Sequence, residues 1–238
     1  MIKRLLLFLV VTFFGFQLSA QSEFKPELNI GIGAGPTFSS SSLNVMNSRT
    51  TIDTKNLTQL HAGVSVRYIT EKHFGLIGEL NFAQMGWEDN FDDIIVEEGK
   101  EAPEYKRTLN YLEMPLLTHI YFGSDKARFF INLGPKISFL LSEKETKNKA
   151  LQDYIDKNAS TNIAPLLKHY GKDVENKIDY GITAGMGFEL RTKFGYFTLE
   201  GRYYFGLADI FKSQKGEDFS RSANREISAR LTYYTKIF

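Results

Sequence analysis

The 238-residue sequence has no cysteine, almost no net charge and no long apolar run beyond its first 20 residues. Without cysteine there is no disulfide, no thiolate metal ligand and no thiol nucleophile. The 29 Lys and Arg residues nearly balance the 28 Asp and Glu residues, so no overall field favours nucleic acid, and we expect no nucleic-acid partner. A helix needs about 20 apolar residues to cross a membrane, whereas a strand needs only about 9–11.

The first 20 residues have the pattern of a secretory signal peptide. Lys3 and Arg4 form a basic start, an apolar run extends from Leu5 to Phe16, and Ala20 is a small residue before the expected cleavage site. We therefore expect residues 1–20 to be a signal peptide, and residues 21–238 to form one domain that functions outside the cytoplasm.

Residues Asn110–Phe122 show a pattern that recurs along the chain. Their even positions are nearly all apolar, whereas their odd positions include Glu113, Pro115 and His119. Successive side chains of a strand point to opposite faces, so the segment predicts a strand with one apolar face and one mixed face. Seven more segments alternate in this way: 28–38, 60–69, 74–85, 128–142, 178–190, 196–207 and 226–233.

The links between these eight segments alternate in length. Short links are expected at 70–73, 123–127 and 191–195, and long links at about 39–59, 86–106, 143–177 and 207–222. Outer-membrane barrels have an even number of strands, short periplasmic turns and long extracellular loops. The sequence therefore predicts an all-β fold, an eight-stranded antiparallel up-and-down transmembrane β-barrel in the cell outer membrane.

In such a barrel the apolar parity faces lipid and the mixed parity fills the interior. Charges of both signs are expected to pair there, because an unpaired buried charge costs several kcal/mol. Glycines of the same parity, such as Gly33 and Gly185, leave room for long side chains, and we expect a bulge at Pro115 and at Pro135. The predicted interior polar network consists of Arg67, Glu79, Glu113, His119, Lys136, Glu189, Glu200, Arg202, Glu226 and Arg230.

No group of residues predicts a catalytic, cofactor or metal site. The four histidines lack the spacing of metal ligands, and Gly31–Gly35 lacks the third glycine and the helix of a dinucleotide-binding loop. The acidic link 86–106 is either a solvated loop or a contact to lipopolysaccharide through divalent cations. The link 143–177 has apolar residues, with Pro165 near an expected helix start, and is either a lid or a surface for an extracellular protein partner.

The chain resembles the small outer-membrane β-barrel proteins of Bacteroidetes, called PorT-like or outer membrane protein beta-barrel domain proteins. The resemblance is carried by N-Y-L-E-M-P-L-L (110–117), I-N-L-G-P-K-I-S-F-L-L-S (131–142), D-Y-G-I-T-A-G-M-G-F-E-L (179–190) and L-E-G-R-Y-Y-F-G-L-A-D-I (199–210). It implies insertion into the outer membrane, with outer-membrane lipid and lipopolysaccharide as surroundings. One branch of the family is linked to a secretion apparatus, but no residue here singles out that branch.

The last residue, Phe238, matches the terminal phenylalanine by which barrel-insertion machinery recognises outer-membrane proteins, so we predict it to be an insertion signal. Such proteins usually have apolar residues two and four places earlier, where this chain has Lys236 and Tyr234. We therefore expect either a bulge near Tyr233–Thr235 or a chain end that extends beyond the lipid.

The leading interpretation is a non-enzymatic outer-membrane protein with a plugged polar interior and long extracellular loops. Its expected role is structural or in surface interaction, and an accessory role in secretion is one form of it. The alternatives are a small-solute porin and a lipid-modifying enzyme of the outer membrane. A soluble lipocalin-like carrier also has eight strands, but it requires the apolar parity inside the barrel and the charges outside.

Overall fold

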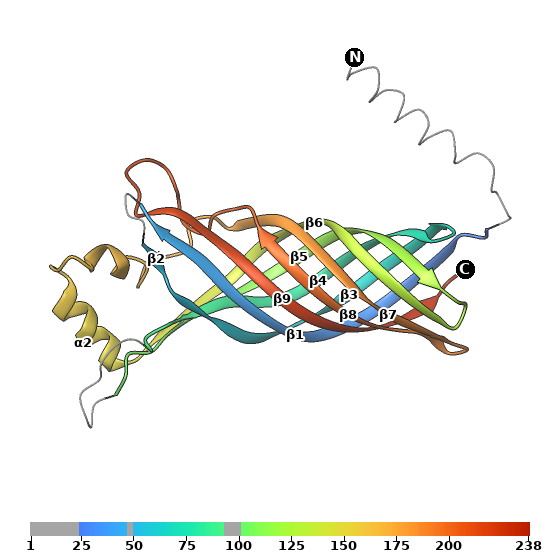
Figure 1. Cartoon of the computed structure of the whole chain (residues 1–238), viewed down its shortest axis with the longest axis horizontal. Helices are drawn as coiled ribbons and strands as arrows, with labels where there is room; N and C mark the ends of the chain where they lie inside the picture. Colours follow the sequence, from blue (N-terminus) through green and yellow to red (C-terminus); the bar gives the residue numbers. More distant parts are fainter. Residues whose placement is uncertain (1–23, 47–49, 93–100) are drawn as a thin grey trace, which may run out of the picture.

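The computed structural model describes residues 24–46, 50–92 and 101–238, so the predicted signal peptide lies outside the described residues. Within these residues, one antiparallel sheet closes on itself because β1 also pairs with β9 (Figure 1). Its strands are β1 (Glu27–Val45), β2 (Thr51–Ile52), β3 (Thr54–Glu71), β4 (Phe74–Asp89), β5 (Tyr105–Gly123), β6 (Ala127–Lys147), β7 (Ile178–Thr192), β8 (Gly195–Gly206) and β9 (Phe219–Lys236). The eight long strands correspond to the eight predicted segments, and β2 is a two-residue addition that pairs with β1.

The long strands follow one another in an up-and-down order, as predicted. Short turns join β3 to β4, β5 to β6 and β7 to β8 at the end where β1 begins and β9 finishes, which we call the turn end. Helix α2 (Lys149–Asn158) and the 3₁₀ helix η2 (Ala164–Leu167) lie at the opposite end, which we call the loop end (Figure 1). Among the described residues, no helix is long and apolar enough to cross a membrane.

The two faces of the sheet have the reverse of the polarity found in soluble proteins. Outward side chains such as Leu116 and Phe188 are 59% and 66% exposed, and most of the 36 large hydrophobic residues exposed in the described part of the chain lie on the outward faces of the strands. Inward side chains include Arg230, which is 0% exposed, and Glu113, which is 4% exposed. Burial of charge together with exposure of apolar side chains is expected where the surrounding medium is hydrocarbon.

The strands are longer at the loop end than the sequence predicted. The prediction of a long link at 39–59 is wrong. Strand β1 continues to Val45, with Ser39–Ser42 paired to β9, and β3 already begins at Thr54. The link expected at 143–177 is shorter for the same reason, since β6 continues to Lys147. Ser39–Ser42 are polar on both faces of β1, so the ladder of hydrogen bonds continues there although the alternation in sequence has ended.

The bulges expected at the two prolines are also wrong. Pro115 stays in register opposite Lys136, and Pro135 stays in register opposite Ile182. The ladders instead omit the pairs that Pro115 and Pro135 would make with their other neighbours, on β4 and β5 respectively. A missing N–H therefore leaves a gap in the ladder without shifting it.

The bulge in β6 lies instead at Leu141. Asn110 pairs with Ser142 and Tyr111 pairs with Leu140, so Leu141 is an extra residue with no partner on β5. An extra residue inverts the side-chain alternation beyond it. Below the bulge the even positions of β6 point inward, whereas above it Glu143 and Glu145 do so.

The last strand has no bulge near Tyr233–Thr235. Its register with β1 shifts once, at Ser220 at the loop end, and is then constant from Arg221 to Lys236, which lies opposite Asn29. The chain end therefore extends past the last paired residue at the turn end, where the backbone carbonyl of Phe238 accepts a hydrogen bond from the N–H of Leu28. The role of Phe238 as an insertion signal stays a prediction.

Candidate functional site

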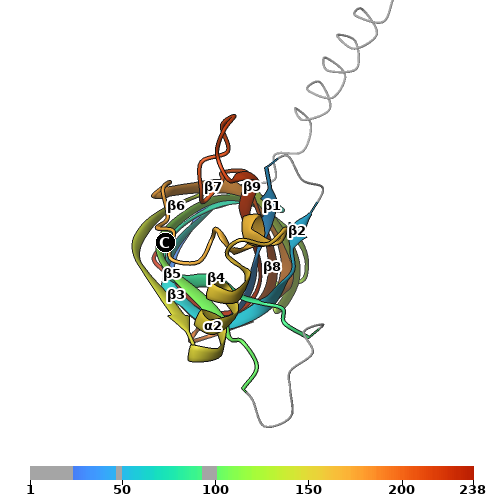
Figure 2. The ribbon, with the colours of Figure 1, turned by 90° about the vertical axis from the view of Figure 1, so that its left-hand side faces the viewer.

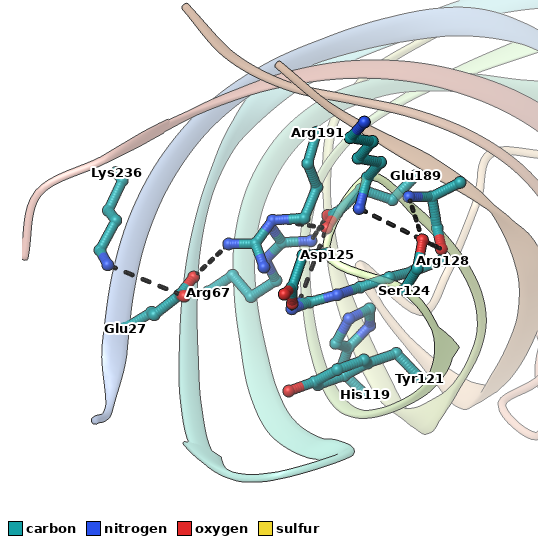
Figure 3. Close-up of polar contacts among 12 residues, drawn as sticks. Glu27, Arg67, His119, Tyr121, Ser124, Asp125, Arg128, Glu189, Arg191 and Lys236 are labelled. Carbon is teal, nitrogen blue, oxygen red and sulfur yellow. Dashed lines mark hydrogen bonds and ion pairs between the residues drawn. The ribbon is translucent and has the colours of Figure 1, made fainter. Parts of the chain in front are cut away.

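The barrel interior contains charged side chains in three layers. The first layer lies at the turn end (Figure 3). In this first layer Glu189 of β7 contacts the guanidinium groups of three arginines: it accepts a hydrogen bond from Arg67 and lies 3.6 Å from Arg191 and 3.9 Å from Arg128. Arg191 also binds Glu27 at 2.6 Å. These arginines come from β3, β6 and β7, so the layer ties together strands that are not all neighbours in the sheet.

Aromatic rings complete the first layer. The guanidinium carbons of Arg67 and Arg128 lie 4.2 Å and 4.3 Å from the ring centres of Tyr234 and Tyr121. His119 stacks on Tyr121, and its Nδ1 lies 2.7 Å from the Oδ1 atom of Asn132. Cation–π contacts of this kind supply partners for charged groups that have few hydrogen bonds.

The middle layer centres on Arg202 of β8. Its guanidinium donates two hydrogen bonds of 2.7 Å to Glu79 across the barrel and one of 2.7 Å to Glu200. Asn81 donates to Glu79 and in turn accepts a hydrogen bond of 3.0 Å from Arg230. A bidentate arginine–carboxylate pair fixes geometry as well as charge, so this layer holds opposite walls at a set separation.

The upper layer centres on Lys136 of β6. Its ammonium group donates to Glu113 at 2.6 Å and to Glu226 at 3.0 Å, and it lies 3.8 Å from the ring centre of Tyr204. The hydroxyl of Tyr204 donates to Asp179 at 3.0 Å. Lys136 is thus a single cation placed between two buried carboxylates.

Side chains fill nearly all the space between these layers. A Cβ atom added at Gly33 would lie 2.7 Å from Nε of Arg230, and one added at Gly185 would lie 2.4 Å from Oε1 of Glu200. A space of about 20 Å³ beside His61 is lined mainly by polar groups, which is room for about one water molecule. All ten residues of the predicted polar network lie in these layers. Six basic residues (Arg67, Arg128, Lys136, Arg191, Arg202, Arg230) share the interior with six carboxylates (Glu79, Glu113, Asp179, Glu189, Glu200, Glu226).

Apolar side chains close the barrel at the loop end. Trp87, Met85 and Leu43 point inward from the strands, and Leu151 of α2 and Phe211 pack against them. The segment that follows α2 crosses the opening of the ring of strands (Figure 2). We call residues 148–177 the lid. The helices expected in this segment are confirmed, with Pro165 in the first turn of η2.

Charged groups hold the lid on the barrel. Arg107 of β5 donates a hydrogen bond of 2.7 Å to the carbonyl of Lys172 and one of 3.0 Å to Glu145, between the rings of Trp87 and Phe211. Glu145 also accepts hydrogen bonds from the backbone N–H of Gly171. The bulge at Leu141 places Glu145 where it can make both sets of contacts.

Glu143, the other carboxylate turned inward by the bulge, lies beside Glu145. It accepts hydrogen bonds of 3.2 Å from the backbone N–H of Val174 and lies 3.9 Å from Arg107. The lid is therefore attached to β6 at two points.

Asp89 forms a third attachment. Its Oδ2 atom lies 2.7 Å from Nε2 of His169 and accepts a hydrogen bond of 2.6 Å from the hydroxyl of Tyr170. Burial and the neighbouring Asp89 carboxylate raise the pKa of the Tyr170 hydroxyl, so this group keeps its proton and remains a donor. Both lid residues are thus bound to one buried carboxylate at the end of β4.

The residues that hold the lid were not among the predicted site residues. Asp89, Glu143 and Glu145 fall in the predicted links 86–106 and 143–177, and Arg107 lies just before the predicted strand 110–122. One signal was present in the sequence. Every second residue before Tyr111, namely Leu109 and Arg107, continues the alternation of the strand and is therefore expected to point inward as Tyr111 does.

We predict that replacing Arg107 by Ala will loosen the lid. Hydrogen bonds to charged groups contribute about 1.5–3 kcal/mol, so amide exchange at Gly171 and Val174 is expected to become tens of times faster. Hydrogen–deuterium exchange measures this directly. The matched control is Lys177→Ala, which removes an exposed side chain 3.6 Å from Glu143. Equal protection in wild type and Arg107→Ala would show that Arg107 does not hold the lid and that the contacts of Glu143, Glu145 and Asp89 and the apolar packing suffice.

Comparisons with known proteins identify the family. The model of the "Outer membrane protein beta-barrel domain" family matches residues 19–212. No curated protein sequence matches the chain. Solved structures similar to it include Ail, the attachment invasion locus protein of Yersinia pestis (11% identity, TM-score 0.40, 88% of this chain and 99% of that one). The outer membrane protein W of E. coli is also similar (14% identity, TM-score 0.40, 88% and 98%).

The family assignment rests on the family model, because similarity to the solved structures is too low to add to it. The match covers most of the chain, from β1 to β8, and ends before β9, which supplies Glu226 and Arg230 to the charged layers. The localisation predicted from sequence is thereby confirmed as the outer membrane. The chain belongs to the outer membrane protein beta-barrel domain family.

Proposed function

We propose that this protein is a non-enzymatic, membrane-spanning eight-stranded barrel with a closed interior, its loop end outside the cell and its turn end in the periplasm. The observation that carries the proposal is the exposed apolar band around a charged and fully packed interior. Outer-membrane barrels have short periplasmic turns and long extracellular loops, which supports this orientation. The role is structural or in surface interaction, and the filled interior argues against a porin.

A row of outward hydrogen bonds marks the upper edge of the apolar band. Gln84 donates to Asn110 at 3.0 Å, and Asn110 donates to Ser142 at 2.8 Å, across β4, β5 and β6. Just above this row, Lys106 and Lys144 are exposed on the same outward face. We propose that these lysines contact lipopolysaccharide phosphates and that the outer leaflet lies at this level.

The lid supports a surface role more than transport. Its apolar residue Leu151 is buried in the barrel mouth, so the exposed surface offered to an extracellular partner is the polar side of α2. The motif Y-L-E-M-P-L-L supports membership of the PorT-like family of Bacteroidetes, for which an accessory role in secretion is one form of surface interaction.

Nitroxide scanning along β5 tests the proposal, and the lack of cysteine allows single labels on an otherwise native chain. In lipid vesicles, oxygen accessibility from Leu112 to Phe122 is expected to oscillate with a period of two residues, with maxima at even positions. Maxima at odd positions, or no oscillation, would refute a lipid-facing apolar band. In intact cells, an impermeant maleimide should label Lys147→Cys and spare Lys126→Cys, and the reverse would invert the orientation.

A further inference from the structure

Positive charge gathers at the turn end of the barrel. The described residues there include seven basic side chains (Lys25, Lys72, Lys126, Arg128, Arg191, Lys193 and Lys236) and four carboxylates (Glu27, Glu71, Asp125 and Glu189). At the loop end, the described carboxylates outnumber the lysines and arginines. The two ends of a nearly neutral chain therefore differ in the sign of their charge.

Four of these cations have no partner within the described chain, namely Lys25, which precedes β1, and three lysines of the short turns. Lys72, Lys126 and Lys193 each lie in one of the three short turns, and each is exposed. None of their ammonium groups forms an ion pair or hydrogen bond with a described residue, whereas Lys236 lies 3.7 Å from Glu27. The free positive charge is thus distributed around the rim, with one lysine in each turn.

Exposed apolar side chains lie next to these lysines. Phe194, which follows Lys193 at the tip of its turn, is 87% exposed. Between β5, β6 and β7 an outward groove of about 410 Å³ begins beside Lys126, and the paired rings of Phe129 and Phe188 lie along it, 5.4 Å apart. Aromatic rings next to lysines are typical of the boundary between hydrocarbon and headgroups.

We propose that the turn end binds anionic phospholipids of the periplasmic leaflet, with Lys72, Lys126 and Lys193 contacting their phosphate groups and the groove accepting an acyl chain. The proposal rests on the membrane orientation given under Proposed function. A docked protein would approach one side of the rim, whereas lipid surrounds it, and the lysines occur in all three turns. Exposed lysines near a negatively charged membrane surface are attracted to its headgroups.

Electron paramagnetic resonance with spin-labelled lipids tests this on the full barrel in phosphatidylcholine vesicles. Wild type is expected to associate with labelled phosphatidylglycerol at least about twofold more strongly than with labelled phosphatidylcholine at low salt. The preference is expected to fall towards one in K72Q/K126Q/K193Q. The matched control K147Q/K149Q/K215Q removes three exposed lysines at the loop end and is expected to keep the wild-type ratio.

An unchanged ratio in the turn-end variant, or an equal fall in the control, would overturn the proposal. Raising the salt concentration on the wild-type protein gives a second measurement that needs no variant, because screening removes contacts between exposed charges. A preference that persists at high salt would also overturn it. Failure of the wild-type chain to enter vesicles is a different result, which would refute the membrane-spanning barrel itself.

Discussion

Replacing Lys136 by Met is expected to destabilise the barrel by about 3–5 kcal/mol, because the change leaves Glu113 and Glu226 buried without their shared cation. The side chains of all three residues are at most 6% exposed, so water cannot replace the lost contacts. Urea unfolding of the protein in lipid vesicles, followed by tryptophan fluorescence of Trp87, measures the change.

Two further variants separate loss of charge pairing from loss of packing. The triple variant K136M/E113Q/E226Q removes the unpaired charges and is expected to recover most of the lost stability. Lys126→Met, at an exposed turn, is expected to change stability by about 0.5 kcal/mol or less. If Lys136→Met and the triple variant were equally unstable, packing around the aliphatic stem of Lys136 would explain the loss instead of electrostatics.

Replacing Leu116 by Arg is expected to destabilise the barrel by about 2–4 kcal/mol in a lipid bilayer, because the side chain lies near the middle of the outward apolar band. In a soluble protein the same change at a 59% exposed position would have little effect, since water would solvate the guanidinium. Reversible unfolding from vesicles gives the free energy.

The matched control is Leu141→Arg, which changes the same residue type near the upper edge of the band. Leu141 is 56% exposed, so the two sites differ in depth and hardly in exposure. Its expected effect is about 0–1 kcal/mol. Equal losses of stability at Leu116 and Leu141 would contradict a band in which Leu116 lies deeper in the hydrocarbon than Leu141.

The sequence predicts the membrane-facing wall well because one physical constraint determines it. Wherever lipid contacts one face and ionisable groups occupy the other, the alternation has a period of two, and segments such as 110–122 and 178–190 show it clearly. The strand order and the closure by β1 and β9 follow from eight such segments joined by links of alternating length.

The loop end could not be predicted in the same way. Ser39–Ser42 are polar on both faces, so nothing in their pattern distinguishes a paired strand from a loop. The bulge at Leu141 is hidden because two consecutive leucines fit either alternation. The partners within the network also depend on strand stagger, which brings Arg202 to Glu79 across the barrel although 123 residues separate them.

The extra residue at Leu141 divides β6 into two parts with opposite side-chain alternation. Below it, the odd positions of β6 point outward with the apolar band. Above it, the odd positions Glu143 and Glu145 point inward, where they contact the lid. The inversion occurs at a single position. Substitutions in β6 beyond Leu141 can therefore change the contacts at the loop end, while the alternation of apolar and polar side chains below Leu141 stays the same. Variation in extracellular recognition is thereby separated from the constraints of insertion.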